Sequence, residues 1–364
     1  MLIWVPSKEV LMRKNRAWFL GPRIRNRDNK SSSRWTLRCL ALPMLAALWC
    51  VPAAAQCTAY VTAHKSNNVV VVDTFLDRVV AVIPVQIQPL AVAITPNGAF
   101  AYVTNSGWIF GSNSVSVIDT ASNTVVATIP VGSFPVGIAI TPNGAFAYVA
   151  NLNSNSVSVI NTATNTVTAT IGVGSGGPYG VAITPDGAFA YVTNLNSNDV
   201  SVISTATNTV VATVPVGSGP VAVAITPNGA FAYVTNQSSN NVSVIDTTTN
   251  TVVAIVPVGV GPVAVAITPN GALVYVANSA SNTVSVIGTA TNAVMTTVTV
   301  TWAPDGVATT PDGAFAYVVN EFANTLSVID STTNTVVDTV QGVAMYPVGI
   351  AIMHSSNMPT LKCR

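Results

Sequence analysis

The stretch ITPNGAFAYVTN runs from Ile94 to Asn105, and the identical residues return from Ile225 to Asn236. Close variants of this phrase begin at Ile140, Ile183, Ile267 and Thr309. Its tyrosine recurs at intervals of 42, 46, 43, 42, 42 and 42 residues, at Tyr60, Tyr102, Tyr148, Tyr191, Tyr233, Tyr275 and Tyr317. A period near 42 residues indicates one supersecondary unit that is present seven times.

Each unit contains four short runs that are typical of β-strands. In the second unit they are LAVAIT (90–95), AFAYVT (99–104), SVSVID (114–119) and TVVATIPV (124–131). Pro96-Asn97-Gly98 favours a tight hairpin turn, and the polar stretch from Asp119 to Thr124 favours a turn capped by its own side chains. No helical periodicity follows residue 55. The pattern predicts an all-β fold, a seven-bladed β-propeller of four-stranded antiparallel blades.

The two ends of the repeat array complement each other. The array starts at the second strand of a unit, AYVT at 59–62, and ends with an orphan first strand, PVGIAIM at 347–353. We expect the last strand to pair into the first blade, because this pairing closes the ring and leaves no open junction. Closure would bring Cys57 and Cys363 to the same blade, where they either form a disulfide or stay two independent thiols.

The repeated unit also resembles a known family. ITPNGAFAYVTN followed by SNSVSVIDTASNTVVATIPVGSFPVG (112–137) is similar to the YVTN-family β-propeller repeat, which occurs in surface-layer-like and other exported proteins of bacteria and archaea. The similarity covers roughly residues 57–353. It implies a secreted or surface-associated propeller and says little about chemistry, because this fold carries both binding proteins and enzymes.

The charges divide the chain into two parts. Ten of the 14 Lys and Arg residues precede residue 56, whereas residues 56–364 carry four basic and eleven acidic residues, a net charge of −7. Arg34 and Arg38 precede the apolar run 39–50, and the small residues of VPAAA follow it. We therefore predict a basic leader and secretory signal peptide over 1–55 and the propeller over 56–364, in the periplasm or at the cell surface. Membrane-spanning segments and nucleic-acid binding are not expected of the mature chain.

Metal and cofactor chemistry has little support in the sequence. The two histidines, His64 and His354, are expected on opposite faces of the ring. Innermost strands such as VGIAI and VAVAI carry no acid or base, so we expect no carboxylate cluster on the channel wall. Aspartates that end third strands, such as Asp119 and Asp246, are interpreted as turn caps. We predict no catalytic residue, no metal site and no cofactor.

One face of the propeller should carry the variable connections. These are the loops between second and third strands and the links between blades, and surface loops are where binding residues concentrate. Unusual residues gather there on blades seven, one and two, with a few on other links. The candidate binding residues are His64, Lys65, Trp108, Phe110, Phe134, Trp302, Glu321, Phe322 and Tyr346. The alternative is that these aromatic residues only cover blade junctions.

Three functions are compatible with this arrangement. The leading hypothesis is an exported, non-catalytic propeller that binds an envelope protein or glycan through the variable face. The alternative is a hydrolase of the propeller lactonase type, or an accessory protein of a periplasmic oxidoreductase. That alternative needs polar groups at the channel mouth, for which the candidates are His64, Lys65, Asp305 and Glu321. A surface-layer role with self-association through the low-charge sides of the ring is the third.

Overall fold

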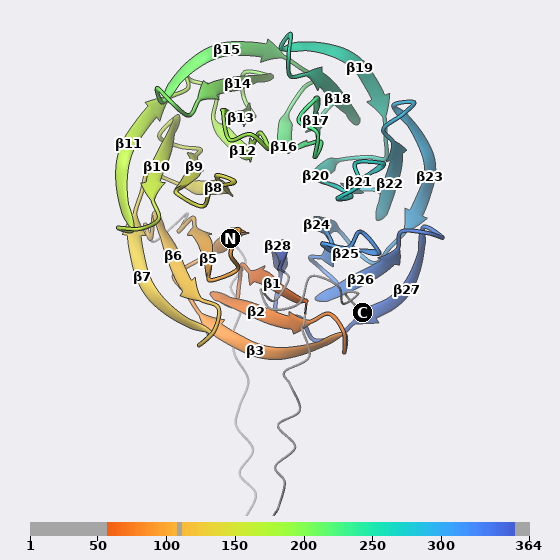
Figure 1. Ribbon diagram of the computed structural model, residues 1–364. Coiled ribbons are helices and arrows are strands. Elements are labelled where there is room, and N and C mark those ends of the chain that lie inside the picture. Colours follow the sequence, from red (N-terminus) through yellow and green to blue (C-terminus); the bar gives the residue numbers. More distant parts are fainter. Residues whose placement is uncertain (1–56, 108–110, 354–364) are drawn as a thin grey trace, which may run out of the picture. The chain divides into compact units, whose positions relative to one another are not determined.

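The computed structural model describes residues 57–107 and 111–353, which belong to one compact unit, Val51–Arg364. These residues form 28 strands in seven four-stranded antiparallel sheets around a central channel (Figure 1). The predicted all-β, seven-bladed propeller is therefore confirmed. No helix in the described part of the chain is long and apolar enough to cross a membrane. The predicted leader and signal peptide, residues 1–55, lie outside the described residues.

The strands of each blade follow one another from the channel outward. Blade one consists of β28 (Pro347–Met353), β1 (Thr58–Ala63), β2 (Asn68–Asp73) and β3 (Arg78–Pro84). Blade two has β4 (Pro89–Ile94), β5 (Phe100–Asn105), β6 (Ser114–Asp119) and β7 (Thr124–Pro130). Blade three has β8 (Pro135–Ile140), β9 (Phe146–Asn151), β10 (Ser156–Asn161) and β11 (Thr166–Gly172). Blade four has β12 (Pro178–Ile183), β13 (Phe189–Asn194), β14 (Asp199–Ser204) and β15 (Thr209–Pro215).

The remaining blades repeat this order. Blade five has β16 (Pro220–Ile225), β17 (Phe231–Asn236), β18 (Asn241–Asp246) and β19 (Thr251–Pro257). Blade six has β20 (Pro262–Ile267), β21 (Leu273–Asn278), β22 (Thr283–Gly288) and β23 (Ala293–Thr299). Blade seven has β24 (Pro304–Thr309), β25 (Phe315–Asn320), β26 (Thr325–Asp330) and β27 (Thr335–Val340).

The ring closes as the sequence predicts. Strand β28 pairs antiparallel with β1, with Tyr60 opposite Ala351. Cys57 lies buried beside β1 and is disulfide-bonded. Its predicted partner, Cys363, lies outside the described residues, so the Cys57–Cys363 pairing stays a prediction.

The hydrophobic core lies between neighbouring blades. Tyr102, Val115 and Val117 of blade two pack with Ala147 and Val149 of blade three, and six similar clusters occur around the described ring. Large side chains of one blade fill the space above small side chains of the next, which explains the alternation of the repeated phrase.

A hydrogen bond from each repeated tyrosine joins one blade to the next. Six of the hydroxyls donate to asparagine Oδ1 atoms at 2.6–3.0 Å, in the pairs Tyr60–Asn123, Tyr102–Asn165, Tyr148–Asn208, Tyr191–Asn250, Tyr233–Asn292 and Tyr275–Asn334. The seventh, Tyr317, donates to Asp77 at 2.7 Å. All seven acceptor residues have a left-handed backbone, which Asn and Asp tolerate better than most residues.

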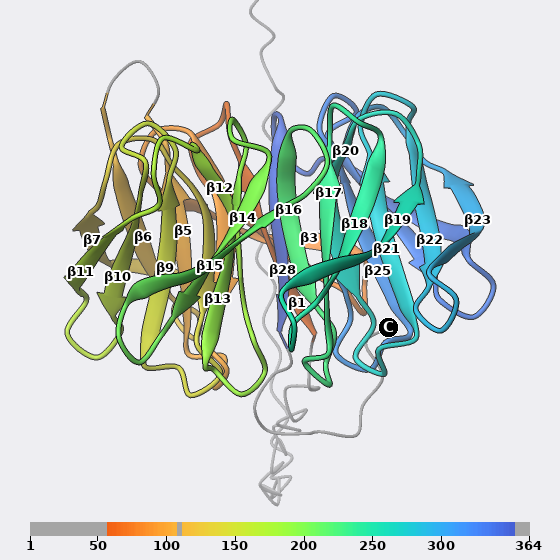
Figure 2. The ribbon, with the colours of Figure 1, turned by 90° about the horizontal axis from the view of Figure 1, so that it is seen from above.

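The two faces of the ring differ as expected (Figure 2). We call the face with the first-to-second and third-to-fourth turns the turn face, and the other the loop face. On the turn face Asp119 Oδ1 accepts hydrogen bonds from the N–H groups of Ala121 and Ser122, which confirms its capping role. On the loop face the Phe134 N–H donates to Asn113 Oδ1 at 3.0 Å. This hydrogen bond joins the link between blades two and three to the loop between the second and third strands of blade two.

Candidate ligand site at the channel mouth

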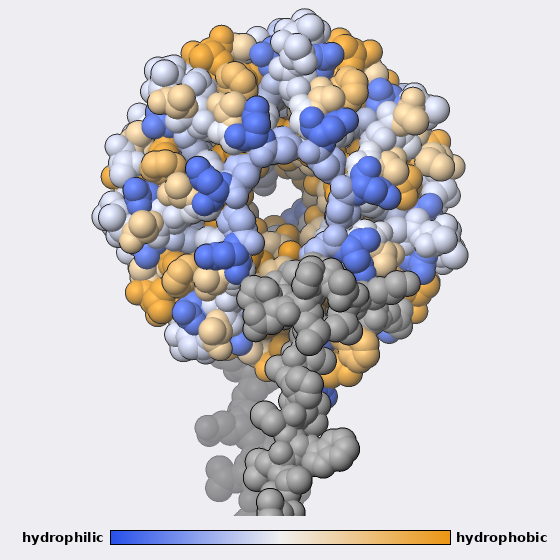
Figure 3. All heavy atoms as spheres, viewed as in Figure 1, coloured by the Kyte–Doolittle hydropathy of each residue, from blue (hydrophilic) through white to orange (hydrophobic). Residues whose placement is uncertain are grey.

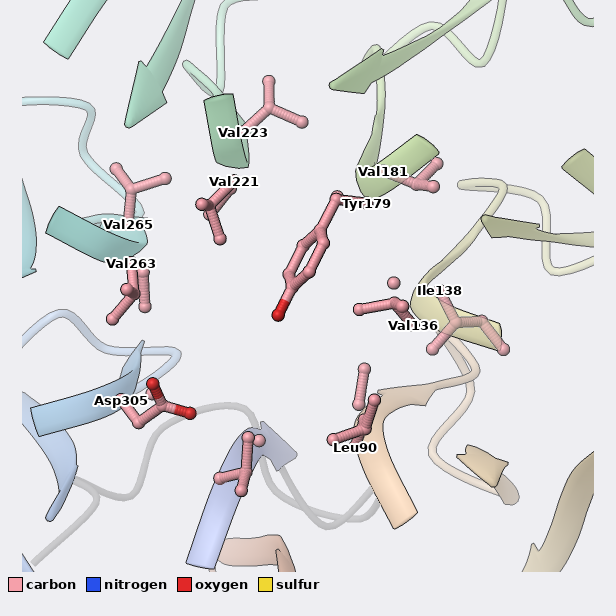
Figure 4. Close-up of a pocket in the computed structure, with 18 of the residues that line it drawn as sticks. Leu90, Val136, Ile138, Tyr179, Val181, Val221, Val223, Val263, Val265 and Asp305 are labelled. Atoms are coloured by element: carbon pink, nitrogen blue, oxygen red, sulfur yellow. The ribbon is translucent and has the colours of Figure 1, made fainter. Parts of the chain in front are cut away.

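Seven equivalent residues surround the channel, one on each innermost strand. Each directly follows the proline that begins its strand, and we call the set the lumen ring. Its members are Leu90, Val136, Tyr179, Val221, Val263, Asp305 and Val348. Figure 4 shows Tyr179 and Asp305 directed into the cavity between the innermost strands. Five of the seven units carry an aliphatic residue at this position, so Tyr179 and Asp305 are the two that depart from the repeat.

Close contacts between adjacent innermost strands fix the backbone of the lumen ring. A Cβ atom added to Gly180 would lie 2.4 Å from the carbonyl oxygen of Val221, so adjacent innermost strands approach too closely for a larger residue there. The hydroxyl of Thr193, from the YVT part of the repeat, donates to the same carbonyl at 2.7 Å. Thr62 and Thr104 make the equivalent bonds to Leu90 and Val136 at 2.7 Å. At these positions the contacts hold the backbone and involve no lumen side chain, so the side chains can differ from blade to blade.

A second set of equivalent residues lies at the loop-face end of the channel. Each of these residues directly follows the second strand of its blade. Its N–H donates a hydrogen bond, at 2.8–3.0 Å, to a backbone carbonyl of the same blade, that of the residue just before the proline that begins the innermost strand. This mouth ring consists of His64, Ser106, Leu152, Leu195, Gln237, Ser279 and Glu321. Glu321 therefore lies close to Asp305 on the same blade, and His64 follows on blade one.

The lumen ring lines a cavity of about 320 Å³. The cavity wall is mostly aliphatic, with Leu195 and Gln237 added from the mouth ring. A small cavity whose side chains are mostly aliphatic, with a few polar groups among them, is typical of small-molecule sites. Figure 3 shows the channel open at the centre of the face in view, with hydrophilic residues around it.

Burial and like charges shift the ionisation of the polar groups. Enclosure by the ring, followed by the Glu321 carboxylate, raises the pKa of Asp305 to about 7. The pKa of Tyr179 rises to about 12 because of burial and the nearby Asp305 and Glu321. Burial raises the pKa of Glu321 as well, and Lys65 opposes this rise. Near neutral pH the Asp305 carboxyl can therefore either hold or release a proton.

Several predicted binding residues meet where blades seven and one join. The Lys65 Nζ atom lies 3.5 Å from the centroid of the Tyr346 ring, and the Phe322 ring meets the same ring edge-on at a centroid distance of 5.6 Å. We call Lys65, Phe322 and Tyr346 the seam cluster. The N–H of His64 donates to the Tyr346 carbonyl at 2.9 Å, and burial with the adjacent Lys65 charge lowers the pKa of His64.

Other predicted residues lie apart from this cluster. Trp302 is 68% exposed on the link before blade seven, and Phe134 lies on the link before blade three. Phe134 and Tyr346 both adopt a left-handed backbone, with φ of 55° and 56°, at a position where blades four to six have glycine. Trp108 and Phe110 lie outside the described residues. The role of all these residues in binding stays a prediction.

One expectation about the channel wall is wrong. The innermost strands were expected to carry no acid or base, yet Asp305 lies within β24 and faces the channel. Tyr179 likewise lies within an innermost strand, β12. The sequence does name Asp305 as a candidate polar group at the channel mouth, and the structure places it in the channel. Aligning the seven units on the strand-initial proline also shows that Asp305 and Tyr179 are equivalent positions on the channel wall. Among the described residues, no three His, Cys, Asp or Glu side chains lie close enough to hold a metal ion.

Fold and cavity together define a seven-bladed propeller with a polar pair of side chains in its channel. The chain belongs to the family described as Lactonase, 7-bladed beta-propeller, whose model matches residues 58–172 and 166–253. None of the curated proteins matches this chain.

Solved structures share the fold. Hydrazine synthase of Kuenenia stuttgartiensis has 27% identity and a TM-score of 0.68, over 75% of this chain and 92% of that one. A functionally unknown protein from Desulfotomaculum acetoxidans has 20% identity and a TM-score of 0.71, over 82% and 99%. A protein from Bacteroides uniformis, provisionally assigned as a 6-phosphogluconolactonase, has 15% identity and a TM-score of 0.69, over 82% and 100%. At such identities the last two similarities concern the fold alone.

Proposed function

We propose that the protein is an exported, non-catalytic binding module that recognises an envelope protein or glycan through the loop face. The observation that carries this proposal is the seam cluster. There Tyr346 keeps a left-handed backbone, which costs a bulky residue about 1–3 kcal/mol, while its ring contacts Lys65 and Phe322. Aromatic rings with a cation on a rigid support are typical of recognition surfaces. The basic segment and apolar run before residue 56 support export.

Replacing Phe322 and Trp302 by serine is expected to weaken capture of the partner by about 30-fold, the effect of losing one binding hot spot. The measurement is a pull-down of cell-envelope extract from the source organism on the immobilised protein, followed by titration of the captured partner. Phe75→Ser is the matched control, because Phe75 is 56% exposed on the turn face and Phe322 is 55% exposed. Equal capture by all three proteins would refute a role for the loop face. Self-association as the sole interaction would favour a surface-layer role.

A second candidate function is hydrolysis of a lactone, which family membership and Asp305 favour. An ionised Asp305 could take a proton from a water molecule that attacks the lactone carbonyl carbon. The ring C–O bond then breaks, Asp305 returns that proton to the leaving ring oxygen, and the hydroxy acid leaves. The similarity to hydrazine synthase supports the related alternative, an accessory role beside an oxidoreductase.

If this second candidate is correct, Asp305→Asn should lower the hydrolysis rate of a small aliphatic lactone about 100-fold or more, as expected for loss of a general base. A pH-stat assay measures the acid released. Asp186→Asn is the control, because this turn-face residue is Asn in other units. Equal rates for the wild type and Asp305→Asn would exclude Asp305 as the base.

A further inference from the structure

The lumen ring holds a half-buried acid, facing the channel, that no described residue neutralises by contact. The carboxylate of Asp305 points into the cavity and accepts no hydrogen bond from any of the described residues. Lys65, whose charge lowers the pKa of Glu321, lies over the Tyr346 ring and is not among the residues that line the cavity. A carboxylate that is partly withdrawn from water and has no partner in the protein can gain one from a ligand that enters the channel.

We infer that the lumen ring binds a small organic cation, a primary ammonium with a short apolar body, whose charged end contacts Asp305. An ammonium group offers three N–H donors to a carboxylate, and a hydrogen bond between charged groups is stronger than one between neutral groups. Glu321 adds a second negative charge at the channel mouth, on the same blade. The negative electrostatic potential of the two carboxylates favours a cationic ligand over one that carries a carboxylate or phosphate.

The walls of the cavity select the remainder of the ligand. Aliphatic side chains such as Leu90, Val136 and Val221 would contact an apolar body and exclude water from it. Tyr179 reaches into the cavity from blade four, and its hydroxyl makes no hydrogen bond with the described residues. Its ring can contact the cation or the apolar body, and its hydroxyl can bind a polar group at the other end. A strongly hydrated metal ion would not use these apolar walls.

This inference goes beyond the proposed function, because the lumen ring and the seam cluster are different surfaces. It also differs from lactone hydrolysis, since it requires a charged ligand and no bond breaking. Phe322→Ser should therefore leave ligand binding in the channel unchanged. If Phe322→Ser loses capture of the envelope partner but still binds the amine, the loop-face recognition and the amine site in the lumen ring are separate functions.

The experiment is isothermal titration calorimetry of the whole protein with cyclohexylamine, and with cyclohexanol and cyclohexanecarboxylate as neutral and anionic probes of the same shape. We expect saturable binding of the amine and at least tenfold weaker binding of the other two. Asp305→Asn should weaken amine binding about 10- to 100-fold, the contribution of a hydrogen bond between charged groups. Asp186→Asn removes the same charge on the turn face and should change nothing.

A second variant, Asp305→Val, shows whether any loss of binding comes from the site and not from misfolding. Asp305→Val gives blade seven the kind of residue that five other units have, so the fold should tolerate it while amine binding disappears. Tyr179→Phe should retain the amine and change only the selectivity for amines with a distal hydroxyl. Equal amine binding by the wild type and Asp305→Val would overturn the inference, as would tighter binding of cyclohexanecarboxylate or of Ca²⁺ added as chloride.

Discussion

Asp305→Val is expected to stabilise the protein, and the gain should increase as the pH rises from 4 to 8. The cause is the position of Asp305, whose burial and neighbour Glu321 raise its pKa from 3.8 to about 7. Because each pKa unit corresponds to about 1.4 kcal/mol, ionising Asp305 in the folded protein costs roughly 4 kcal/mol at most. Valine carries no charge, so the variant avoids this cost.

The sign of the pH effect follows from the protons bound. Below pH 4 Asp305 is protonated in both the folded and the unfolded chain, and its ionisation has no influence on stability. Between pH 4 and 7 the unfolded chain loses this proton while the folded chain keeps it, so rising pH favours unfolding. Above pH 7 the full cost remains. The turn-face aspartates such as Asp119, whose pKa is lowered by backbone and side-chain hydrogen bonds, act in the opposite direction but are common to both proteins.

The measurement is urea unfolding of the wild type and Asp305→Val at pH 5 and pH 8. We expect the difference in unfolding free energy to be larger at pH 8, by about 1–4 kcal/mol. Asp186→Asn serves as the control, because the pKa of Asp186 is lowered by its hydrogen bonds to Thr184 and Ala188. A difference that is the same at both pH values would show that Asp305 is not buried as an uncompensated acid.

Removing β28 should have the largest effect of any change considered. A chain that ends at Tyr346 lacks the innermost strand of blade one, so the edge of β1 is exposed and the ring opens between blades seven and two. Ile350, Ile352 and Met353 pack on the cores at both sides of that blade. Full burial of such side chains is worth about 1.5–3 kcal/mol each, and these three are partly buried. Their combined loss is still large against the whole stability of a domain, about 5–15 kcal/mol.

We therefore expect the truncated protein to lose its cooperative thermal transition and to form aggregates through the free strand edge. Size-exclusion chromatography and differential scanning calorimetry measure the two effects. Truncation also removes Cys363, so full-length Cys363→Ser is the control that separates the strand from the predicted disulfide. A monomeric truncated protein with the wild-type melting temperature would contradict the importance of closure.

The fold could be predicted from the sequence because its determinants are local and repeated. The period of the tyrosines and the hairpin turns specify the number of strands and their pairing within each blade from neighbouring residues. The one distant pairing, between the orphan strand 347–353 and the first blade, follows from counting the strands at the two ends of the array. The capping role of Asp119 follows in the same way from neighbouring residues.

The site was harder to predict, since it depends on contacts between blades. Asp305 and Tyr179 follow inter-blade links of variable sequence, and only the start of each innermost strand decides that they face the channel. Both side chains point into the same cavity, although they lie far apart in the chain. The contact of Lys65 with Tyr346 likewise depends on ring closure, which brings blade one against blade seven.

The equivalence of the seven lumen positions has an evolutionary consequence. Hydrogen bonds from the hydroxyls of Thr62, Thr104 and Thr193 hold the backbone of three ring positions, and adjacent strands approach closely at small residues such as Gly180. Neither contact depends on the side chain that enters the channel. After duplication of one ancestral unit, single substitutions at this position could therefore change ligand selectivity without rebuilding the scaffold. The pair Tyr179 and Asp305 is one such combination, and related propellers with other pairs at these positions would be expected to accept other ligands.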